Sequence, residues 1–372
     1  MAAPSPTLSP LAAPSTDVDA LPIKQLRRAV EDLFEPRPLW YWPDFIASAA
    51  CFYGGLAMVA TTTVGTPFKL AAAIVSVLGL YRAVIFIHEL AHFPPGRMRA
   101  FRFTWNLVCG VPLLAPDFIY GSHVDHHRRQ VYGTAGDGEY LPWGLPGHRV
   151  AILAFLLSSL VAMPAAVVRF GLLGPLSWFN QTLREWVAVN ASSLVVDMRY
   201  RRTPPSPAEA RRWRRQEAAV FVYLCAIAAG LLTSVISVGL LALLYLTLSA
   251  ALFLNGLRTL AAHRYRASGA PLTATQQLLD SINYPHHPFP AELWAPVGLR
   301  YHAVHHLFPG IPYHNLPVAH ARIGRQLPPG SPYHQTQGQG LLSSLRDLWR
   351  AARVEREVAG RGAALRSGDA GG

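Results

Sequence analysis

Histidine is the residue type whose number and spacing in this sequence could do chemistry. Nine of the 15 histidines lie in four short segments. They are His88 and His92 in HELAH, His123, His126 and His127 in HVDHH, the isolated His263, and His302, His305 and His306 in HAVHH. Helical residues three and four positions apart share a face, so each segment would present its imidazoles in one direction. Nine imidazoles can supply two metal ions with four or five nitrogens each, and neutral imidazole suits iron, zinc or copper.

Cysteine adds no ligands to these segments. The three cysteines, Cys51, Cys109 and Cys225, lie in apolar or aromatic-rich stretches, and three are too few for a disulfide framework. A donor set made almost wholly of nitrogen favours a pair of non-haem iron ions. Such a centre can activate O₂ while it leaves coordination positions open.

The composition places these histidines in a membrane protein. Of the 372 residues, 51% are hydrophobic and only 15% are charged, against about 25% charged in average soluble domains. Mean hydropathy is +0.22. This excludes an ordinary soluble enzyme, a disordered chain and a coiled coil. A net charge of +12 is compatible with binding to nucleic acid or to a membrane surface. The high hydropathy favours the lipid bilayer, and we expect no nucleic-acid partner.

Two apolar stretches are long enough to form membrane-spanning hairpins. Residues 45–64 carry no charge, and a three-residue turn joins them to a second run at 68–87. Residues 218–257 are uncharged over 40 positions, or about 60 Å as helix, twice the hydrocarbon thickness of about 30 Å. The second stretch must therefore turn, which gives spans near 218–236 and 238–257.

A third apolar run, residues 150–168, decides the topology. If it spanned, there would be five spans, the histidine segments would lie on opposite faces, and the basic segment 199–215 would be translocated against the positive-inside rule. We therefore predict an all-α integral membrane protein with four transmembrane helices in two hairpins. A cytosolic helical cap carries the histidine segments, and 150–168 is re-entrant or interfacial. A fifth true span is the alternative.

The rest of the chain divides around this membrane domain. Residues 1–20 predict a disordered tail, because they are rich in Pro, Ala, Ser and Thr. A surface helix and an aromatic belt are expected in 21–43, and the membrane domain in 44–325. Residues 326–372 are expected to hold a basic amphipathic helix followed by a disordered tail.

At this point a family resemblance becomes visible. The three histidine boxes and the phrase HHLFPGIPYHNLP (residues 305–317) resemble the membrane fatty-acid desaturase and hydroxylase superfamily, over residues 41–316. The resemblance implies an O₂-dependent enzyme with two iron ions and an acyl chain threaded into a narrow tunnel beside them. It implies these iron ligands: His88, His92, His123, His126, His127, His302, His305 and His306. His263 matches the isolated ligand that follows the last span in many members, although Thr259 stands where acyl-CoA desaturases often have Asn.

Several further residues and partners follow from this interpretation. Asp125, Asp280 and His314 are predicted to orient ligand histidines by hydrogen bonds, and Arg82 is predicted to pair with Glu89 within one helix. The sequence contains no cytochrome-like segment, so we expect a separate ferredoxin-type or cytochrome-type electron donor. The expected location is a bacterial inner membrane, with the histidines on the cytosolic face.

Desaturation of an acyl-lipid chain is the main prediction, and three alternatives remain. A hydroxylase or ketolase of the same superfamily could act on a lipid, a carotenoid or a small unusual chain. His88 to His92 also fits the HExxH signature of zinc metalloproteases, with Glu89 as base, but residues 218–257 offer no Asp as third ligand and seven histidines would stay unexplained. A transporter would need more ionisable residues inside the spans than Arg82.

Overall fold

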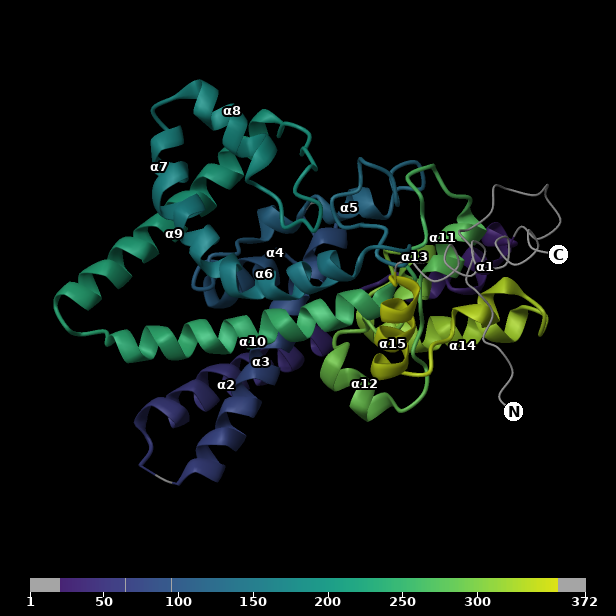
Figure 1. Cartoon of the computed structure of the whole chain (residues 1–372), viewed down its shortest axis with the longest axis horizontal. Coiled ribbons are helices and arrows are strands. Elements are labelled where there is room, and N and C mark those ends of the chain that lie inside the picture. The colour runs from purple at the N-terminus through teal and green to yellow at the C-terminus, as the bar shows by residue number, and fades with distance from the viewer. Residues whose placement is uncertain (1–20, 64, 95, 354–372) are drawn as a thin grey trace, which may run out of the picture.

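The computed structural model describes residues 21–63, 65–94 and 96–353. The predicted tail at 1–20 and the end of the chain beyond 353 lie outside these residues. Helices make up the regular structure of the described residues, which form no strand and only isolated bridges such as His263 to Ser281. The all-helical class predicted from the sequence is therefore confirmed (Figure 1).

The helices have the following bounds. The α-helices are α1 (Ile23–Ala29), α2 (Pro38–Thr61), α3 (Thr66–His92), α4 (Arg99–Trp105), α5 (His123–His126), α6 (Arg149–Val168), α7 (Gly174–Ser177), α8 (Gln181–Asn190), α9 (Pro207–Leu232), α10 (Val238–Ala262), α11 (Ala274–Asp280), α12 (Pro288–Trp294), α13 (His302–Leu307), α14 (Leu316–Gln326) and α15 (Leu341–Ala351). Short 3₁₀ or π segments are η1 (Glu31–Leu33), η2 (Asn106–Gly110), η3 (Asp117–Tyr120), η4 (Arg169–Leu173), η5 (Tyr313–Asn315) and η6 (Pro332–Thr336).

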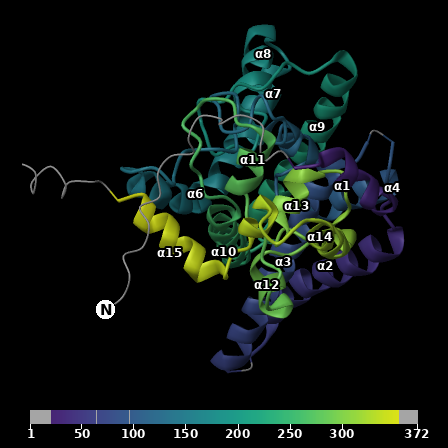
Figure 2. The ribbon, with the colours of Figure 1, turned by 90° about the vertical axis from the view of Figure 1, so that its right-hand side faces the viewer.

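Five helices in the described part of the chain are long and apolar enough to cross a membrane: α2, α3, α9, α10 and the stretch Arg149–Ser177 that begins with α6. Helices α2 and α3 pack against each other as one hairpin, whereas α9 and α10 are joined by a short turn and diverge from it (Figure 1). Both hairpin tips lie at the left of Figure 1, and α1, α11, α13 and α14 lie at the right. Figure 2 looks onto that right-hand end, where α11, α13 and α14 face the viewer and α10 is seen along its axis.

The uncertain apolar run forms helix α6, which packs along α10. The hydroxyl of Tyr245 on α10 donates to the carbonyl oxygen of Leu160 at 2.8 Å, and Gly256 lies against Leu156. The opposite face of α6 is apolar and exposed, with Val150 at 78% and Val161 at 60% exposure. A helix with an unpacked apolar face of this kind suits contact with lipid.

Small residues bring α2 and α3 into close contact. A Cβ atom built on Gly79 of α3 would lie 2.7 Å from the backbone nitrogen of Phe52, and one built on Gly55 of α2 would lie 2.7 Å from the carbonyl oxygen of Ala72. Both distances are shorter than real Cβ contacts allow. Close approach at small residues is the usual way in which membrane helices gain packing contacts.

This contact predicts the effect of a single methyl group. Gly79→Ala should lower the free energy of unfolding by about 1–3 kcal/mol, because the new Cβ must push the α2 backbone away. The matched control is Gly54→Ala, since nothing lies within 4 Å of its added Cβ. Thermal unfolding of the detergent-purified protein should show a lower Tm for the first variant only. Equal Tm values would contradict the packing described here.

The predicted pairing of Arg82 with Glu89 is wrong. Arg82 forms an ion pair with Asp44 of α2, at 2.6 Å from Nε to Oδ1, and a second with Glu292 of α12 at 3.0 Å. Glu89 instead accepts hydrogen bonds from the Tyr41 hydroxyl and, at 3.0 Å, from the backbone N–H of Tyr313. Residues seven apart share a helix face but are separated by about 10 Å along the axis. Asp44 on the neighbouring helix α2 lies beside Arg82, so its carboxylate can contact the guanidinium directly.

Candidate metal centre

Four structural elements carry the nine clustered histidines. His88 and His92 occupy the last turns of α3, where it leaves the apolar bundle. HVDHH forms the one-turn helix α5 and its C-cap residue, and HAVHH lies within α13. His263 follows α10 directly in an extended conformation, and its bridge to Ser281 fixes that conformation.

The side chains of these histidines gather in two groups. The five-histidine group consists of His88, His92, His123, His127 and His305, and the four-histidine group of His126, His263, His302 and His306. Within each group the ring nitrogens that face one another lie within 4.8 Å, and seven of the nine residues are buried. All nine histidines that the sequence singled out are thus brought together, although their role as ligands remains a prediction.

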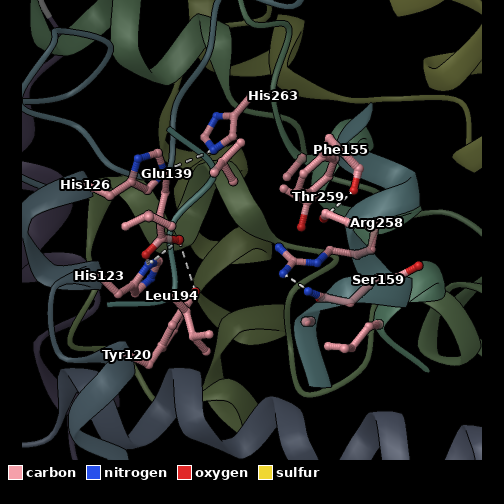
Figure 3. A pocket seen from close by; sticks show the side chains of 18 of the residues that line it. Tyr120, His123, His126, Glu139, Phe155, Ser159, Leu194, Arg258, Thr259 and His263 are labelled. Carbon is pink, nitrogen blue, oxygen red and sulfur yellow. Dashed lines mark hydrogen bonds and ion pairs between the residues drawn. The ribbon is translucent and has the colours of Figure 1, made fainter. Parts of the chain in front are cut away.

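Two acidic residues fix the ring orientation in the HVDHH segment. The Nδ1 atom of His123 lies 2.9 Å from both carboxylate oxygens of Glu139, as Figure 3 shows. The Nδ1 atom of His126 lies 2.9 Å from Oδ2 of Asp137, which is fully buried. A carboxylate only accepts hydrogen bonds, so Nδ1 carries the proton in each ring. The Nε2 atom of each ring is left with its lone pair directed into the group.

The spacing of the nitrogens fits a metal cage. The Nε2 atom of His127 lies 2.9 Å from that of His123 and 3.1 Å from that of His305. In the other group the Nε2 atom of His302 lies 2.8 Å from that of His263 and 3.1 Å from that of His306. Metal–nitrogen bonds of about 2.1 Å at right angles place neighbouring nitrogens about 3 Å apart. Two metal ions therefore fit the residues present.

Unpartnered nitrogens support the same fit. Both ring nitrogens of His88 and the Nε2 atom of His92 are buried without a hydrogen-bond partner. Buried polar atoms are almost always satisfied in folded proteins, so each exception needs an explanation. A metal ion in the five-histidine group would bind one nitrogen of each ring and so supply a partner for one of the two His88 nitrogens and for Nε2 of His92.

His263 is held by an indirect hydrogen-bond chain. Its Nδ1 atom contacts the hydroxyl of Tyr132 at 2.8 Å, and that hydroxyl donates to Asp280 at 2.7 Å. The hydroxyl of Tyr140 also donates to Asp280, at 2.9 Å. Burial raises the pKa of Asp280, and the hydrogen bonds from Tyr132 and the Arg266 backbone oppose that rise. Asp280 therefore acts on His263 through Tyr132 rather than by a direct hydrogen bond.

The buried rings favour the neutral state that binds metal. Burial, followed by the proximity of other histidines, lowers the pKa well below the ordinary value at these residues: His127, His263, His302 and His306. His126 differs, because its pKa is raised overall. Burial lowers this pKa, but Asp137 and the other nearby carboxylates together raise it by more. At Glu139, burial raises the carboxylate pKa, but His123 and its other neighbours lower it by more, so this pKa is lowered overall.

The other two predicted orienting residues make different contacts. Asp125 binds the hydroxyl of Tyr200 at 3.1 Å and Arg128 at 3.2 Å. The Nε2 atom of His314 accepts from the backbone N–H of Arg37 at 3.2 Å, and its ring stacks on Trp40. The two contacts of His314 join the start of α2 to the segment that follows α13.

Sequence reasoning missed Asp137 and Glu139, which are the acids that contact the rings. The signal was available, because the acidic stretch GDGEY follows HVDHH by nine residues. Nothing in the spacing alone shows that the intervening loop folds back. The N–H groups of Gly133 and Glu139 donate to Asp137 at 2.9 and 3.0 Å, and these hydrogen bonds hold the loop in that shape.

Asp137→Asn should weaken metal binding. The amide can donate a hydrogen bond toward Nδ1 of His126 and so favours the wrong tautomer, in which Nε2 carries the proton. Loss of such an orienting group typically costs about 10–100-fold in metal affinity or activity. Iron content and chelator release rates would measure the effect. Asp125→Asn is the matched control and should retain iron; a similar loss in both variants would contradict the orienting role.

A cavity borders both histidine groups. It has a volume of about 230 Å³ and lies between α6 and α10, with His123, His126, His263 and His302 at one side. Figure 3 shows Phe155 and Thr259 on the opposite side from His123 and His126. Further lining side chains include Ala162, Leu252 and Asn255. The cavity can hold a mainly apolar molecule beside both groups.

The chain is similar to known proteins both in a family model and in a characterised relative. The family model described as fatty acid desaturase matches residues 65–337, a range that includes all nine clustered histidines. A ceramide hydroxylase of Caulobacter vibrioides (strain NA1000 / CB15N) is 38% identical over 335 residues, which cover 89% of this chain and 93% of that protein.

Proposed function

Because the chain belongs to the fatty acid desaturase family, we propose that this oxidoreductase hydroxylates a long-chain lipid of the ceramide type. The observation that carries the proposal is the pair of histidine groups on one cavity, in a chain that aligns with a ceramide hydroxylase over most of its length. The sequence alone favoured desaturation. The relative favours the hydroxylase alternative, and both reactions begin at a C–H bond beside the metal ions.

The proposed cofactors are two iron ions, one in each histidine group. When bound, they supply the O₂-dependent oxidation of an unactivated C–H bond. Hydroxylation places one oxygen atom of O₂ in that bond and releases the other as water, which consumes two electrons and two protons. A separate ferredoxin-type or cytochrome-type protein is the proposed source of the electrons.

The protein's own residues orient the rings and position the lipid. Asp137 and Glu139 hold the rings of His126 and His123 with their lone pairs toward the metal positions. The apolar side chains of Phe155 and other cavity residues exclude water from the lipid chain. The carbon nearest the histidines is the one to be oxidised.

We also propose that four helices, α2, α3, α9 and α10, cross the inner membrane of a bacterium, with the histidines on the cytosolic face. Helix α6 would then be re-entrant or interfacial. Lys69, in the first turn of α3, is the basic residue nearest the hairpin tips, whereas 199–215 is strongly basic. The contact of α6 with α10 and its exposed apolar face fit this placement.

The test is lipid analysis with the purified, iron-loaded protein. A long-chain ceramide would be incubated with O₂ and a ferredoxin reducing system, and the products would be identified by mass spectrometry. A gain of one oxygen atom supports the proposal. A loss of two hydrogen atoms would reassign the protein as a desaturase. An unchanged ceramide, with fatty acids modified instead, would overturn the substrate assignment.

A further inference from the structure

An arginine lies in the cavity beside the histidine groups. Arg258 belongs to α10, five residues before His263, and only 8% of its surface is exposed. It lines the same cavity as His123, His126 and His263. In Figure 3 its guanidinium group points into that space, toward the side where these histidines lie.

Among the described residues, Arg258 is the buried arginine that has neither an anion nor a backbone carbonyl oxygen as a hydrogen-bond partner. Arg169 and Arg184 share Glu217. Arg300 donates to two backbone carbonyl oxygens, of Tyr284 and Pro285. Within the described residues, Arg258 forms no ion pair. One of its Nη atoms donates to Oδ1 of Asn255 at 3.0 Å, and its guanidinium also interacts with the Tyr81 side chain.

The unused donors of Arg258 need an acceptor. Its Nε–H is buried and has no hydrogen-bond partner. A guanidinium carries five N–H donors in a fixed plane and cannot lose its charge inside a protein. Leaving such a group unsatisfied in a mostly apolar cavity is unfavourable. A molecule that brings an oxygen atom into the cavity would remove that penalty.

On the basis of the proposed function, we propose that Arg258 binds an uncharged oxygen of the lipid substrate, an amide carbonyl or a hydroxyl, close to the carbon that is oxidised. Asn255, Ser158 and Thr259 line the same cavity, and their amide and hydroxyl groups can form hydrogen bonds with the amide and hydroxyl groups of a ceramide. The cavity of about 230 Å³ touches both the arginine and the histidines. The bound oxygen and the oxidised carbon therefore lie on one short stretch of the lipid, and oxidation occurs near its polar end.

The first experiment replaces the arginine in the iron-loaded protein. Arg258→Met should weaken ceramide binding by about 10- to 100-fold, as expected for a lost hydrogen bond to a charged group, and should leave iron content unchanged. Arg258→Lys should recover part of the affinity. Arg149→Met is the matched control, because Arg149 stacks on Trp349 outside the cavity. Loss of iron in Arg258→Met, with Arg258→Lys unable to restore ceramide binding, would overturn the proposal.

A second experiment uses wild-type protein, so it does not depend on the variant folding. Binding of a ceramide, a long-chain fatty acid amide and an alkane of equal length would be compared. We expect both oxygen-containing lipids to bind at least about tenfold more tightly than the alkane. Analogues of the ceramide that lack the amide carbonyl oxygen or the neighbouring hydroxyl identify which oxygen Arg258 holds. Equal binding of the alkane would overturn the role of Arg258.

These outcomes separate the two proposals. Tight binding of the fatty acid amide without ceramide binding would defeat the ceramide assignment and leave the role of Arg258 intact. Ceramide that binds but loses two hydrogen atoms would defeat the hydroxylase assignment only. Hydroxylation in the middle of the chain, far from any oxygen, would overturn the inference and support the proposed function.

Discussion

Replacing His302 with alanine is expected to abolish turnover and to remove at least one of the two iron ions per chain. His302 belongs to the four-histidine group, and its Nε2 atom lies 2.8 Å from that of His263 and 3.1 Å from that of His306. Three nitrogens would remain at that position. Iron content measured by mass spectrometry, together with lipid turnover, would check this expectation.

The two groups also predict a graded result. His305→Ala should abolish turnover but release less iron than His302→Ala, because four ring nitrogens remain in the five-histidine group. His286→Ala is the matched control, since His286 is exposed and belongs to neither group. Full iron content and normal turnover in His302→Ala would defeat the assignment of the four-histidine group as a metal site.

The second large effect is expected from Glu217→Gln, in folding rather than in catalysis. Both oxygens of Glu217 are used, one by Arg169 at 2.5 Å and one by Arg184 at 2.5 Å, and all three side chains are less than 10% exposed. Removing the carboxylate charge leaves two buried cations. Breaking a buried ion pair in this way costs about 3–5 kcal/mol, a large part of the 5–15 kcal/mol that typically stabilises a native protein.

The variant should therefore express poorly or unfold at a much lower temperature. Glu185→Gln is the matched control, since this exposed carboxylate on α8 contacts only Gln181 among the hydrogen bonds that the geometry gives it. Thermal unfolding in detergent would compare the two variants. Equal Tm values would show that Glu217 does not hold α9 to the elements that carry Arg169 and Arg184.

The positions of the nine histidines, and two sets of four or five nitrogens, could be predicted from the sequence, but the assignment of each ring to a group could not. We expected each HxxHH segment to direct its three rings to one side. The structure instead places His123 with His127, and His302 with His306, whereas His126 and His305 belong to the opposite groups. At 3.6 residues per turn, positions i+3 and i+4 differ in direction by about 100°. This angle allows the third ring to point elsewhere.

The helical hairpins were predictable because an apolar run of known length must fold as a helix inside a bilayer. The residues at which these helices begin and end were harder to predict. Helix α9 begins at Pro207, eleven residues before the apolar run, because Ser206 and Glu209 form a capping box there. The acidic partners Asp44, Asp137 and Glu292 come from separate segments, and tertiary packing alone brings them to their cationic or imidazole partners.

Helices α5 and α13 each supply rings to both histidine groups, and this affects how two metal ions bind. Each short helix gives an i, i+4 pair to one group and its i+3 ring to the other. An ion that binds either group therefore orders both helices and lowers the entropic cost of filling the second group. By thermodynamic linkage, an ion in the five-histidine group favours binding to the four-histidine group by the same free energy as the reverse. Iron titration of the apoprotein should accordingly be positively cooperative, with few chains that hold a single ion.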